Sequence, residues 1–172
     1  MSDKTKSQIK SLIPYIVIII AVILIRTFIA TPVQVDGASM YPTLNDKEIL
    51  ILKKYDKSYD RFDIVVFDYN NVRLIKRIIG LPGDTVSYRN NKLYINGKYV
   101  EEPFLKDSIE TTDFDITKLG VKKIPKGYYF VLGDNRTNST DSRIIGLVSE
   151  KDIKGTTNFA VFPINDFGKI DK

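Results

Sequence analysis

A long apolar run near the N-terminus limits what this chain can fold into. Residues 12–25 contain no charged side chain, and only Pro14 and Tyr15 break the aliphatic sequence. Extended as a helix to Ala30, the run is roughly 28 Å long at about 1.5 Å per residue, close to one bilayer core. Pro14 then lies in the first helical turn, where its missing N–H costs little, and Pro32 favours an exit from the helix just before it. The sequence predicts a membrane-spanning segment over residues 12–30.

Three interpretations compete for this apolar run. A buried core helix is expected to carry an amphipathic stripe, and the run has none. A cleavable signal peptide has a basic start, an apolar stretch and small residues after it, but this run is long for such a stretch. We therefore favour a permanent anchor, with Arg26 reaching toward the lipid headgroups.

Basic residues gather around the apolar run. The net charge is +5, and residues 1–30 supply +3 of it, from Lys4, Lys6, Lys10 and Arg26 against Asp3. The rest of the chain carries the remaining +2, which makes nucleic-acid binding the least favoured function. By the positive-inside rule, the basic tail (residues 1–11) is expected in the cytoplasm and the body (residues 31–172) outside the cell membrane, which the chain crosses once.

The chain contains no histidine and no cysteine. The missing histidine excludes a Ser-His-Asp triad and any zinc site that uses imidazole. The missing cysteine excludes a thiol nucleophile, a disulfide and an iron–sulfur cluster, and it is compatible with a body outside the cell. A hydrolase built from this sequence must use hydroxyl, amine, carboxylate or amide groups, or an oxygen-ligated metal.

Beyond Pro32 the sequence predicts short strands separated by turns. The expected strands are residues 33–35, 48–53, 62–69, 72–79, 92–95, 98–100, 128–132, 144–148 and 156–162. Asn96-Gly97 between two of them indicates a hairpin with a type I′ turn. Residues 101–125 are polar and acidic and are expected to form a surface insertion. This pattern predicts a mainly β body, built as an antiparallel sheet or barrel.

Two segments carry candidate reactive groups. Ser39 lies in GASMYPTL at residues 37–44, where Gly37 and Pro42 favour a tight turn. Such a turn exposes a hydroxyl and aims backbone N–H groups at one point, as an oxyanion hole requires, although most serines there are only turn residues or helix caps. Lys76 lies in RLIKRII at residues 73–79, and a lone lysine there is most simply part of an exposed strand face.

The absence of histidine gives Lys76 more weight. A serine nucleophile needs a base, and a lysine amine can serve if it is neutral. A free lysine has a pKa of about 10.4, so only about one in a thousand is neutral at about pH 7.4. Lowering this pKa by about three units corresponds to about 4 kcal/mol of differential desolvation. We expect burial between apolar strands to supply that effect.

Two further segments are rich in turn and polar residues. Residues 80–84, GLPGD, predict a structural turn that ends the lysine strand. Residues 133–143, GDNRTNSTDSR, hold more polar side chains than a turn needs, and they suit a buried hydrogen-bonded network, a solvated loop or a calcium site. Two arginines in this segment argue against calcium, which prefers clustered carboxylates.

Together and in this order, the four segments resemble those of bacterial type I signal peptidases. The resemblance runs from about residue 12 to about residue 162 and includes the anchor directly before the serine turn. It implies a Ser/Lys-dyad serine endopeptidase that removes signal peptides from exported preproteins, with Ser39 as nucleophile and Lys76 as general base. The implied supporting positions are Gly37 as a backbone oxyanion donor, Ser139 beside the lysine, and two ion pairs, Arg77 with Asp134 and Asp141 with Arg143.

The resemblance also implies how substrate binds. An extended peptide would add to strand edges beside the dyad, in pockets that select small residues three and one positions before the cut. The implied substrate-binding positions are Val33, Gln34, Val35, Asp36, Met40, Leu74 and Ile75. The implied partners are preprotein signal peptides, the lipid bilayer and the secretion machinery, with no cofactor, metal or nucleic acid. The single span and the missing histidine resemble the Gram-positive bacterial form.

Two other function classes are weighed against the peptidase. A self-cleaving repressor-type protein shares Ser/Lys chemistry and a related β fold, but it carries a DNA-binding segment where this chain has an apolar run. A membrane-tethered β module that binds peptides or wall components has no need of the pairing between Ser39 and Lys76. The presence of both residues favours the enzyme.

Overall fold

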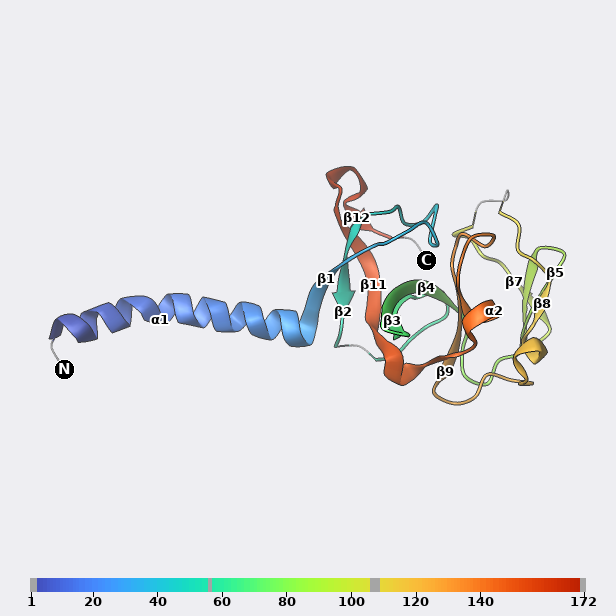
Figure 1. Ribbon diagram of the computed structural model, residues 1–172, viewed down its shortest axis with the longest axis horizontal. Coiled ribbons are helices and arrows are strands. Elements are labelled where there is room, and N and C mark those ends of the chain that lie inside the picture. Colours follow the sequence, from blue (N-terminus) through green and yellow to red (C-terminus); the bar gives the residue numbers. More distant parts are fainter. Residues whose placement is uncertain (1–2, 56, 106–108, 171–172) are drawn as a thin grey trace.

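The computed structural model describes residues 3–55, 57–105 and 109–170, with side chains from residue 12 onward, and it shows a helix standing apart from a β-rich body (Figure 1). Helix α1 (Asp3–Leu24) continues as a π-helical segment, η1 (Ile25–Ile29), and strand β1 (Ala30–Gln34) begins at the next residue. Residues 12–29 have a mean hydropathy of 2.7 and are not buried, so by length and composition this segment is compatible with a membrane span. The side chains of the basic tail lie outside the described residues.

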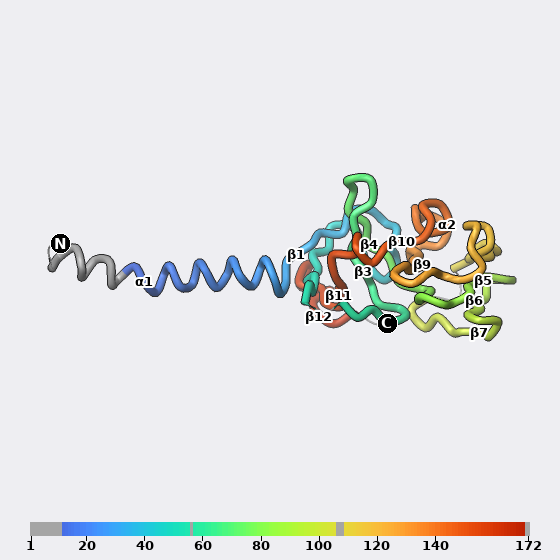
Figure 2. The backbone as a smooth tube through the Cα atoms, turned by 90° about the horizontal axis from the view of Figure 1, so that it is seen from below, coloured from blue at the N-terminus to red at the C-terminus, as the bar shows by residue number. Residues whose placement is uncertain are grey.

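A large antiparallel sheet forms the part of the body next to α1. Its order is β1-β2-β11-β3-β4-β9-β10, and β12 pairs with β11. Figure 2 shows the same body from below, with β1 leading into it from the helix. The bounds of these strands are β2 (Ile49–Lys53), β3 (Ile64–Tyr69), β4 (Val72–Gly80), β9 (Tyr128–Leu132), β10 (Val148–Ser149), β11 (Ile153–Phe162) and β12 (Gly168–Lys169).

A smaller antiparallel sheet lies at the end of the body away from α1 (Figure 1). Its order is β7-β6-β5-β8, with bounds β5 (Val86–Arg89), β6 (Lys92–Ile95), β7 (Lys98–Val100) and β8 (Phe114–Asp115). Short helices complete the fold: η2 (Ile116–Leu119), α2 (Ser142–Ile145), η3 (Glu150–Asp152) and η4 (Ile164–Asp166). The mainly antiparallel β architecture predicted from the sequence is confirmed.

The hydrophobic cores bring together strands that are distant in sheet order. One cluster unites Val33 and Val35 at the start of the body with Met40 after the serine and Ile75 on β4. Strand β1 is the first strand of the sheet and β4 the fifth, so shared packing requires the sheet to curl. The curl brings the segment that carries Ser39 to the strand that carries Lys76. A second cluster, including Tyr88 and Phe130, joins the small sheet to the large one.

Turn chemistry was predicted well at one hairpin. Asn96 and Gly97 both have positive φ angles, 53° and 78°, and they connect β6 to β7 with Ile95 opposite Lys98. Positive φ at both central residues is the type I′ geometry. The predicted hairpin is therefore confirmed.

Two expectations differ from the structure. The strand expected at 144–148 is present only at Val148, where β10 begins. Residues 142–145 form helix α2 instead, because the Asp141 side chain accepts from the Arg143 backbone N–H and caps the helix, which ends at Ile145 before Gly146 with φ 82°. The expected surface insertion at 101–125 is only partly on the surface, since Phe114 and Ile124 are buried in the core beneath the small sheet. Alternating apolar positions in a polar stretch are a weak signal for such a short strand. Residues 106–108 lie outside the described residues.

Candidate active site

Ser39 and Lys76 meet between the serine turn and strand β4. Ser39 is half-buried in the turn between β1 and β2, and Lys76 lies in the middle of β4. Lys76 Nζ is 2.7 Å from Ser39 Oγ and donates to the Ile75 carbonyl oxygen at 2.9 Å. The pair that the sequence predicts as nucleophile and base is thus at hydrogen-bond distance. The arrangement permits direct proton transfer from the hydroxyl to the amine.

Burial sets the protonation of Lys76. Its residue surface is 2% exposed, and this desolvation lowers the pKa of the amine from 10.5 to about 8, against the nearby carboxylates of Asp141 and Asp134, which raise it. Burial disfavours the charged form because the low-dielectric interior solvates an ammonium poorly. With a pKa of about 8, about one Lys76 in five is neutral at about pH 7.4. The amine is therefore available as a base near neutral pH.

The serine turn is held in place by the segment that follows β9. The backbone N–H of Asn135 donates to the Ser39 carbonyl at 3.0 Å, and its side-chain amide donates to the Ala38 carbonyl at 3.0 Å. Gly133 packs directly on this turn, and a Cβ atom there would collide with the Ser39 carbonyl oxygen and with Ser139 Oγ. Only glycine fits at this approach. Asn135 was not predicted as a site residue, and its place beside Gly133-Asp134 was the available signal.

Arg77 and Asp134 form a fully buried ion pair beside Lys76. Both side chains are 0% exposed, and Arg77 Nη2 lies 2.7 Å from Asp134 Oδ2. Arg77 Nε donates to the same carboxylate, Nη1 donates to the Phe62 carbonyl at 2.9 Å, and the guanidinium lies 3.8 Å from the centre of the Phe104 ring. Buried charges require such complete pairing. The pair fastens β4 to the end of β9 at the residue next to the lysine.

Asp141 joins the second predicted pair to the site backbone. Arg143 Nη2 donates to Asp141 Oδ2 at 2.8 Å, and the same oxygen accepts from the Gly133 N–H at 3.1 Å. Arg143 also donates to the Arg136 carbonyl at 2.7 Å. The expected pairing of Asp141 with Arg143 is present, and it ties helix α2 to Gly133, which packs on the serine turn.

Ser139 has a different environment from the expected one. Its Oγ is buried and has no hydrogen-bond partner among the residues that the structure describes. It lies near Gly133, and Lys76 Nζ donates instead to Ser39 Oγ and the Ile75 carbonyl oxygen. A protonated lysine has three N–H donors, so an unpaired hydroxyl near the site is suited to accept the third.

Gly37, the expected second oxyanion donor, is already engaged. Its backbone N–H donates to Asp46 Oδ1 at 2.7 Å, and this bond is the main reason why the pKa of Asp46 is lowered. Gly37 has φ 91°, and a Cβ there would meet open space. The turn before Ser39 is therefore shaped by a backbone conformation that favours glycine and by Asp46 from the far end of the same loop.

The positions predicted to bind substrate divide between core and surface. The buried ones are Val33, Val35, Met40 and Ile75, the exposed ones are Gln34 and Asp36, and Leu74 is half-buried. Strand β1 stands at one end of the sheet order, and β9 pairs with β4 only from Arg77 onward. The edge of β1 and the first half of β4 are therefore placed to receive an added strand.

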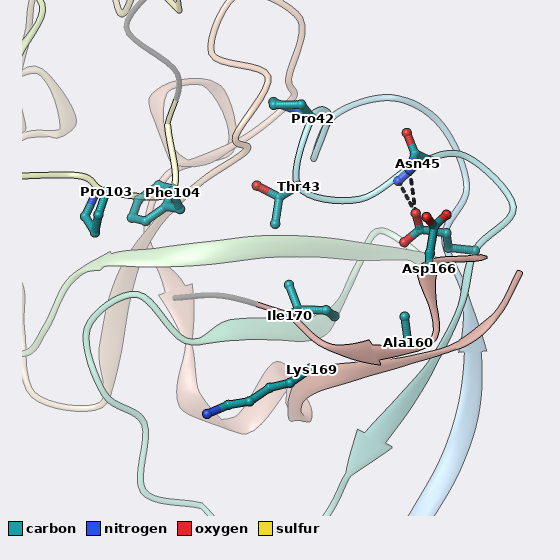
Figure 3. Close-up of a pocket in the computed structure, with 10 residues that line it drawn as sticks. Pro42, Thr43, Asn45, Pro103, Phe104, Ala160, Asp166, Lys169 and Ile170 are labelled. Atoms are coloured by element: carbon teal, nitrogen blue, oxygen red, sulfur yellow. Dashed lines mark hydrogen bonds between the residues drawn. The ribbon is translucent and has the colours of Figure 1, made fainter. Parts of the chain in front are cut away.

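A cavity of about 470 Å³ lies beside the serine turn (Figure 3). Figure 3 shows Pro42 and Thr43 of the turn along one side of the cavity, Asn45 at one end and Phe104 at the opposite end. The side-chain amide of Asn45 donates to Glu48 Oε1 at 2.7 Å. Within the described part of the chain, no group of three or more acidic side chains is arranged to hold a metal ion.

Comparisons with known proteins agree on one family. A family model described as signal peptidase, peptidase S26, matches residues 8–162. Signal peptidase I S of Bacillus subtilis (strain 168) is 43% identical over 182 residues, covering 98% of this chain and 99% of the relative. Signal peptidase I of Bacillus licheniformis is 44% identical over 183 residues, covering 98% of each. A crystal structure of a signal peptidase I from Enterococcus faecalis V583 is 40% identical with a TM-score of 0.53, covering 58% of this chain and 96% of that one.

Removal of Asp134 is expected to destabilise the body strongly. Asp134→Ala leaves the Arg77 guanidinium buried without its carboxylate, which typically costs about 3–5 kcal/mol. Urea unfolding of the full chain in detergent micelles, followed by the near-ultraviolet circular dichroism of its tyrosines, measures this loss. Asp36→Ala, which breaks an ion pair with Lys47 whose side chains are 63% and 73% exposed, is the control and should leave the unfolding midpoint nearly unchanged. Equal effects of the two variants would contradict the assignment.

Proposed function

Since the chain belongs to the signal peptidase family, peptidase S26, and is a serine peptidase of the signal peptidase I type, we propose that Ser39 is its nucleophile and Lys76 its general base. The observation that carries the proposal is the 2.7 Å contact between the hydroxyl and a buried amine. Neutral Lys76 takes the proton of Ser39 Oγ while that oxygen attacks the scissile carbonyl carbon. The protonated amine then gives its proton to the leaving nitrogen, and an acyl-enzyme on Ser39 remains.

Deacylation uses the same two residues. Lys76, neutral again, takes a proton from water, and the resulting hydroxide attacks the ester carbon of the acyl-enzyme. Return of the proton to Ser39 Oγ releases the signal peptide with a free carboxylate. Ser139 Oγ, which is buried near Gly133 and has no hydrogen-bond partner among the described residues, would accept from the ammonium form of Lys76 and orient it.

The oxyanion of the tetrahedral intermediate needs backbone donors. The N–H of Ser39 is the first candidate, and Gly37 is the second by family resemblance. Because the Gly37 N–H donates to Asp46 Oδ1, its use would require Asp46 to release it when substrate binds. The peptidase chemistry does not depend on that release, since one donor of an oxyanion hole contributes only part of the stabilisation.

Substrate is proposed to bind as an added strand between the edge of β1 and the first half of β4. Main-chain hydrogen bonds hold such a peptide, and alternate side chains enter pockets. The flanking Val33, Val35 and Ile75 belong to one packed core, so the space left for substrate side chains is small. We expect small residues at positions three and one before the cut, in signal peptides of exported preproteins.

The apolar helix is proposed to anchor the body at the outer surface of the cell membrane. Because β1 begins at the residue after η1, Ser39 follows the end of the span by only ten positions, from Ile29 to Ser39. This short connection keeps the nucleophile near the bilayer, where the cleavage site of a membrane-inserted signal peptide emerges. Contact with the secretion machinery would follow from the same location.

Substitution of either member of the dyad is expected to abolish cleavage. Ser39→Ala removes the attacking oxygen and Lys76→Met removes the base, so each should lower the cleavage rate of a preprotein by at least about 10³-fold. Purified full-length protein in detergent micelles, mixed with a preprotein that carries alanine at positions −3 and −1, provides the assay. The matched controls are Ser87→Ala and Lys92→Met on the small sheet.

These controls should retain wild-type rates. Full activity of Ser39→Ala or Lys76→Met would contradict the assignment of these residues as nucleophile and base. Unchanged cleavage of a substrate with lysine at position −1 would contradict the small-residue specificity.

The pH dependence should report the buried amine. Lys76 must be neutral to act as base, so kcat/KM should be low near pH 6, rise with an apparent pKa of about 8 and level off above it. Initial rates on a peptide substrate between pH 5.5 and about pH 10.5 test this, with circular dichroism confirming that the protein stays folded. A rate that still climbs at the upper end, as an ordinary lysine would give, contradicts the assignment of a desolvated base.

The orientation can be tested in cells. External protease added to spheroplasts should digest the body, residues 31–172, because the basic N-terminal tail is retained in the cytoplasm. Detergent lysis before protease treatment is the control for accessibility. Full protection of the body in intact spheroplasts, with digestion after lysis, would refute the proposed topology.

A further inference from the structure

A short segment after β7 reaches the active site through two buried arginines. We call residues 101–105 the strap. Its Phe104 ring stacks on the guanidinium of Arg77, and the Glu102 carboxylate pairs with Arg136, whose Nη2 lies 2.7 Å from Glu102 Oε1. The side chains of Arg136 and Glu102 are 0% and 9% exposed. The strap lies in the segment that the sequence assigns to a surface insertion, yet the side chains of Glu102 and Phe104 contact buried arginines.

Arg136 connects the strap to the backbone of the site. Its Nε donates to the Gly133 carbonyl at 3.1 Å. Gly133 packs against the Ser39 carbonyl oxygen and Ser139, and the next residue but one, Asn135, donates its N–H to that same Ser39 carbonyl. A chain of short contacts therefore runs from the Glu102 carboxylate through Arg136 to the residue that carries the nucleophile.

The contacts around Glu102 form a closed buried network. The Tyr88 hydroxyl donates to Glu102 Oε1 at 2.8 Å and accepts from Arg136 Nη1 at 2.9 Å. Arg136 Nη1 also lies 3.3 Å from Thr111 Oγ1. Burial raises the pKa of Tyr88, so its proton stays in place as a donor to the carboxylate. The neutral partners fix geometry, and Glu102 supplies the negative charge that a buried guanidinium needs.

On its other side, the strap faces the serine turn across a cavity. There Phe104 is separated from Pro42 and Thr43 by the cavity of about 470 Å³ (Figure 3). An open space cannot transmit a fixed position, whereas a closed set of short hydrogen bonds can. Coupling between the strap and the dyad therefore depends on the buried arginines.

We propose that Glu102 is a positioning residue of the peptidase site. It acts through Arg136 to hold the Gly133 turn in place, and this turn holds Ser39 at hydrogen-bond distance from Lys76. The proposal rests on the proposed function of that dyad. Without Glu102, Arg136 is a buried cation without its ion-pair partner and must turn toward solvent or draw in water. Either change releases the Gly133 carbonyl. A displacement of about 1 Å at a reacting group is enough to lower kcat by about 10²-fold.

The test measures kcat and KM of full-length protein in micelles on a soluble peptide with alanine at positions −3 and −1. Glu102→Ala should lower kcat by about 10- to 100-fold and leave KM within about threefold, since Glu102 is hydrogen-bonded to Tyr88 and Arg136, which lie outside the strand edges proposed to bind the peptide. Glu102→Gln retains an acceptor oxygen for Arg136 and should recover part of the loss. Glu101→Ala, an exposed neighbour on the same strap, is the matched control and should keep wild-type kcat.

A double-mutant cycle separates positioning from general destabilisation. If Glu102 acts through Arg136, then adding Glu102→Ala to Arg136→Ala should cause no further loss of kcat. Folded fractions from circular dichroism correct each rate, and Glu102→Gln keeps the test valid if the alanine variant folds poorly. A corrected kcat of the Glu102 variants within twofold of wild type, an equal loss in Glu101→Ala, or additive losses in the cycle would each overturn the proposal. If instead the wild type fails to cleave, or Ser39→Ala cleaves equally well, the proposed function itself fails.

Discussion

The site depends on one constraint, the burial of a lysine amine at hydrogen-bond distance from a serine hydroxyl. A lysine in water is charged at neutral pH and cannot act as a base. The pKa of Lys76 is lower than that of a lysine in water because β4 places the residue between β3 and the serine turn, with 2% of its surface exposed. The same packing that desolvates the amine also sets its distance to Ser39. The small-residue specificity that we propose rests on the same packing, because Val33, Val35 and Ile75 belong to one core cluster beside the dyad.

The surrounding charges are arranged so that burial is the stronger effect. Asp134 and Asp141 both raise the pKa of Lys76, yet the pKa still falls to about 8. Each carboxylate is paired with its own arginine, Arg77 or Arg143, so its charge is largely compensated. The two ion pairs therefore fix the backbone around the dyad, and their carboxylates only partly offset the lowering of the Lys76 pKa by burial.

The sequence predicted those parts of the molecule in which local chemistry decides structure. Hydropathy marked the helix, strand-forming runs marked most of the large sheet, and Asn96-Gly97 marked a hairpin. It did not predict helix α2, where the Asp141 cap outweighs the β propensity of Ile144 and its neighbours, nor the engagement of the Gly37 N–H by Asp46. The Asp141 cap is a local signal that the strand-forming side chains around Ile144 concealed, whereas the bond from Gly37 to Asp46 depends on the folded loop, which brings together residues nine positions apart. The missing histidine was the most informative signal, because it left an amine as the candidate base.

The role of the strap could not be predicted from the sequence for the same reason. Glu102 lies in a polar, acidic stretch typical of a surface loop, and only the folded chain brings it to Arg136. Both residues are informative once the buried network is seen, since a buried arginine requires a carboxylate. A site of this kind is built from pairs that are separated by tens of residues, here 34 positions.

The protonation of Lys76 can be measured directly by carbon-13 NMR of the full chain in micelles, with lysines labelled at Cε. The Lys76 resonance is identified by its loss in Lys76→Met, and the titration uses the wild-type chain without substrate. We expect a resonance that titrates with a pKa of about 8. Titration near 10.5, the ordinary value of a lysine, would contradict the claim that burial makes this amine a base.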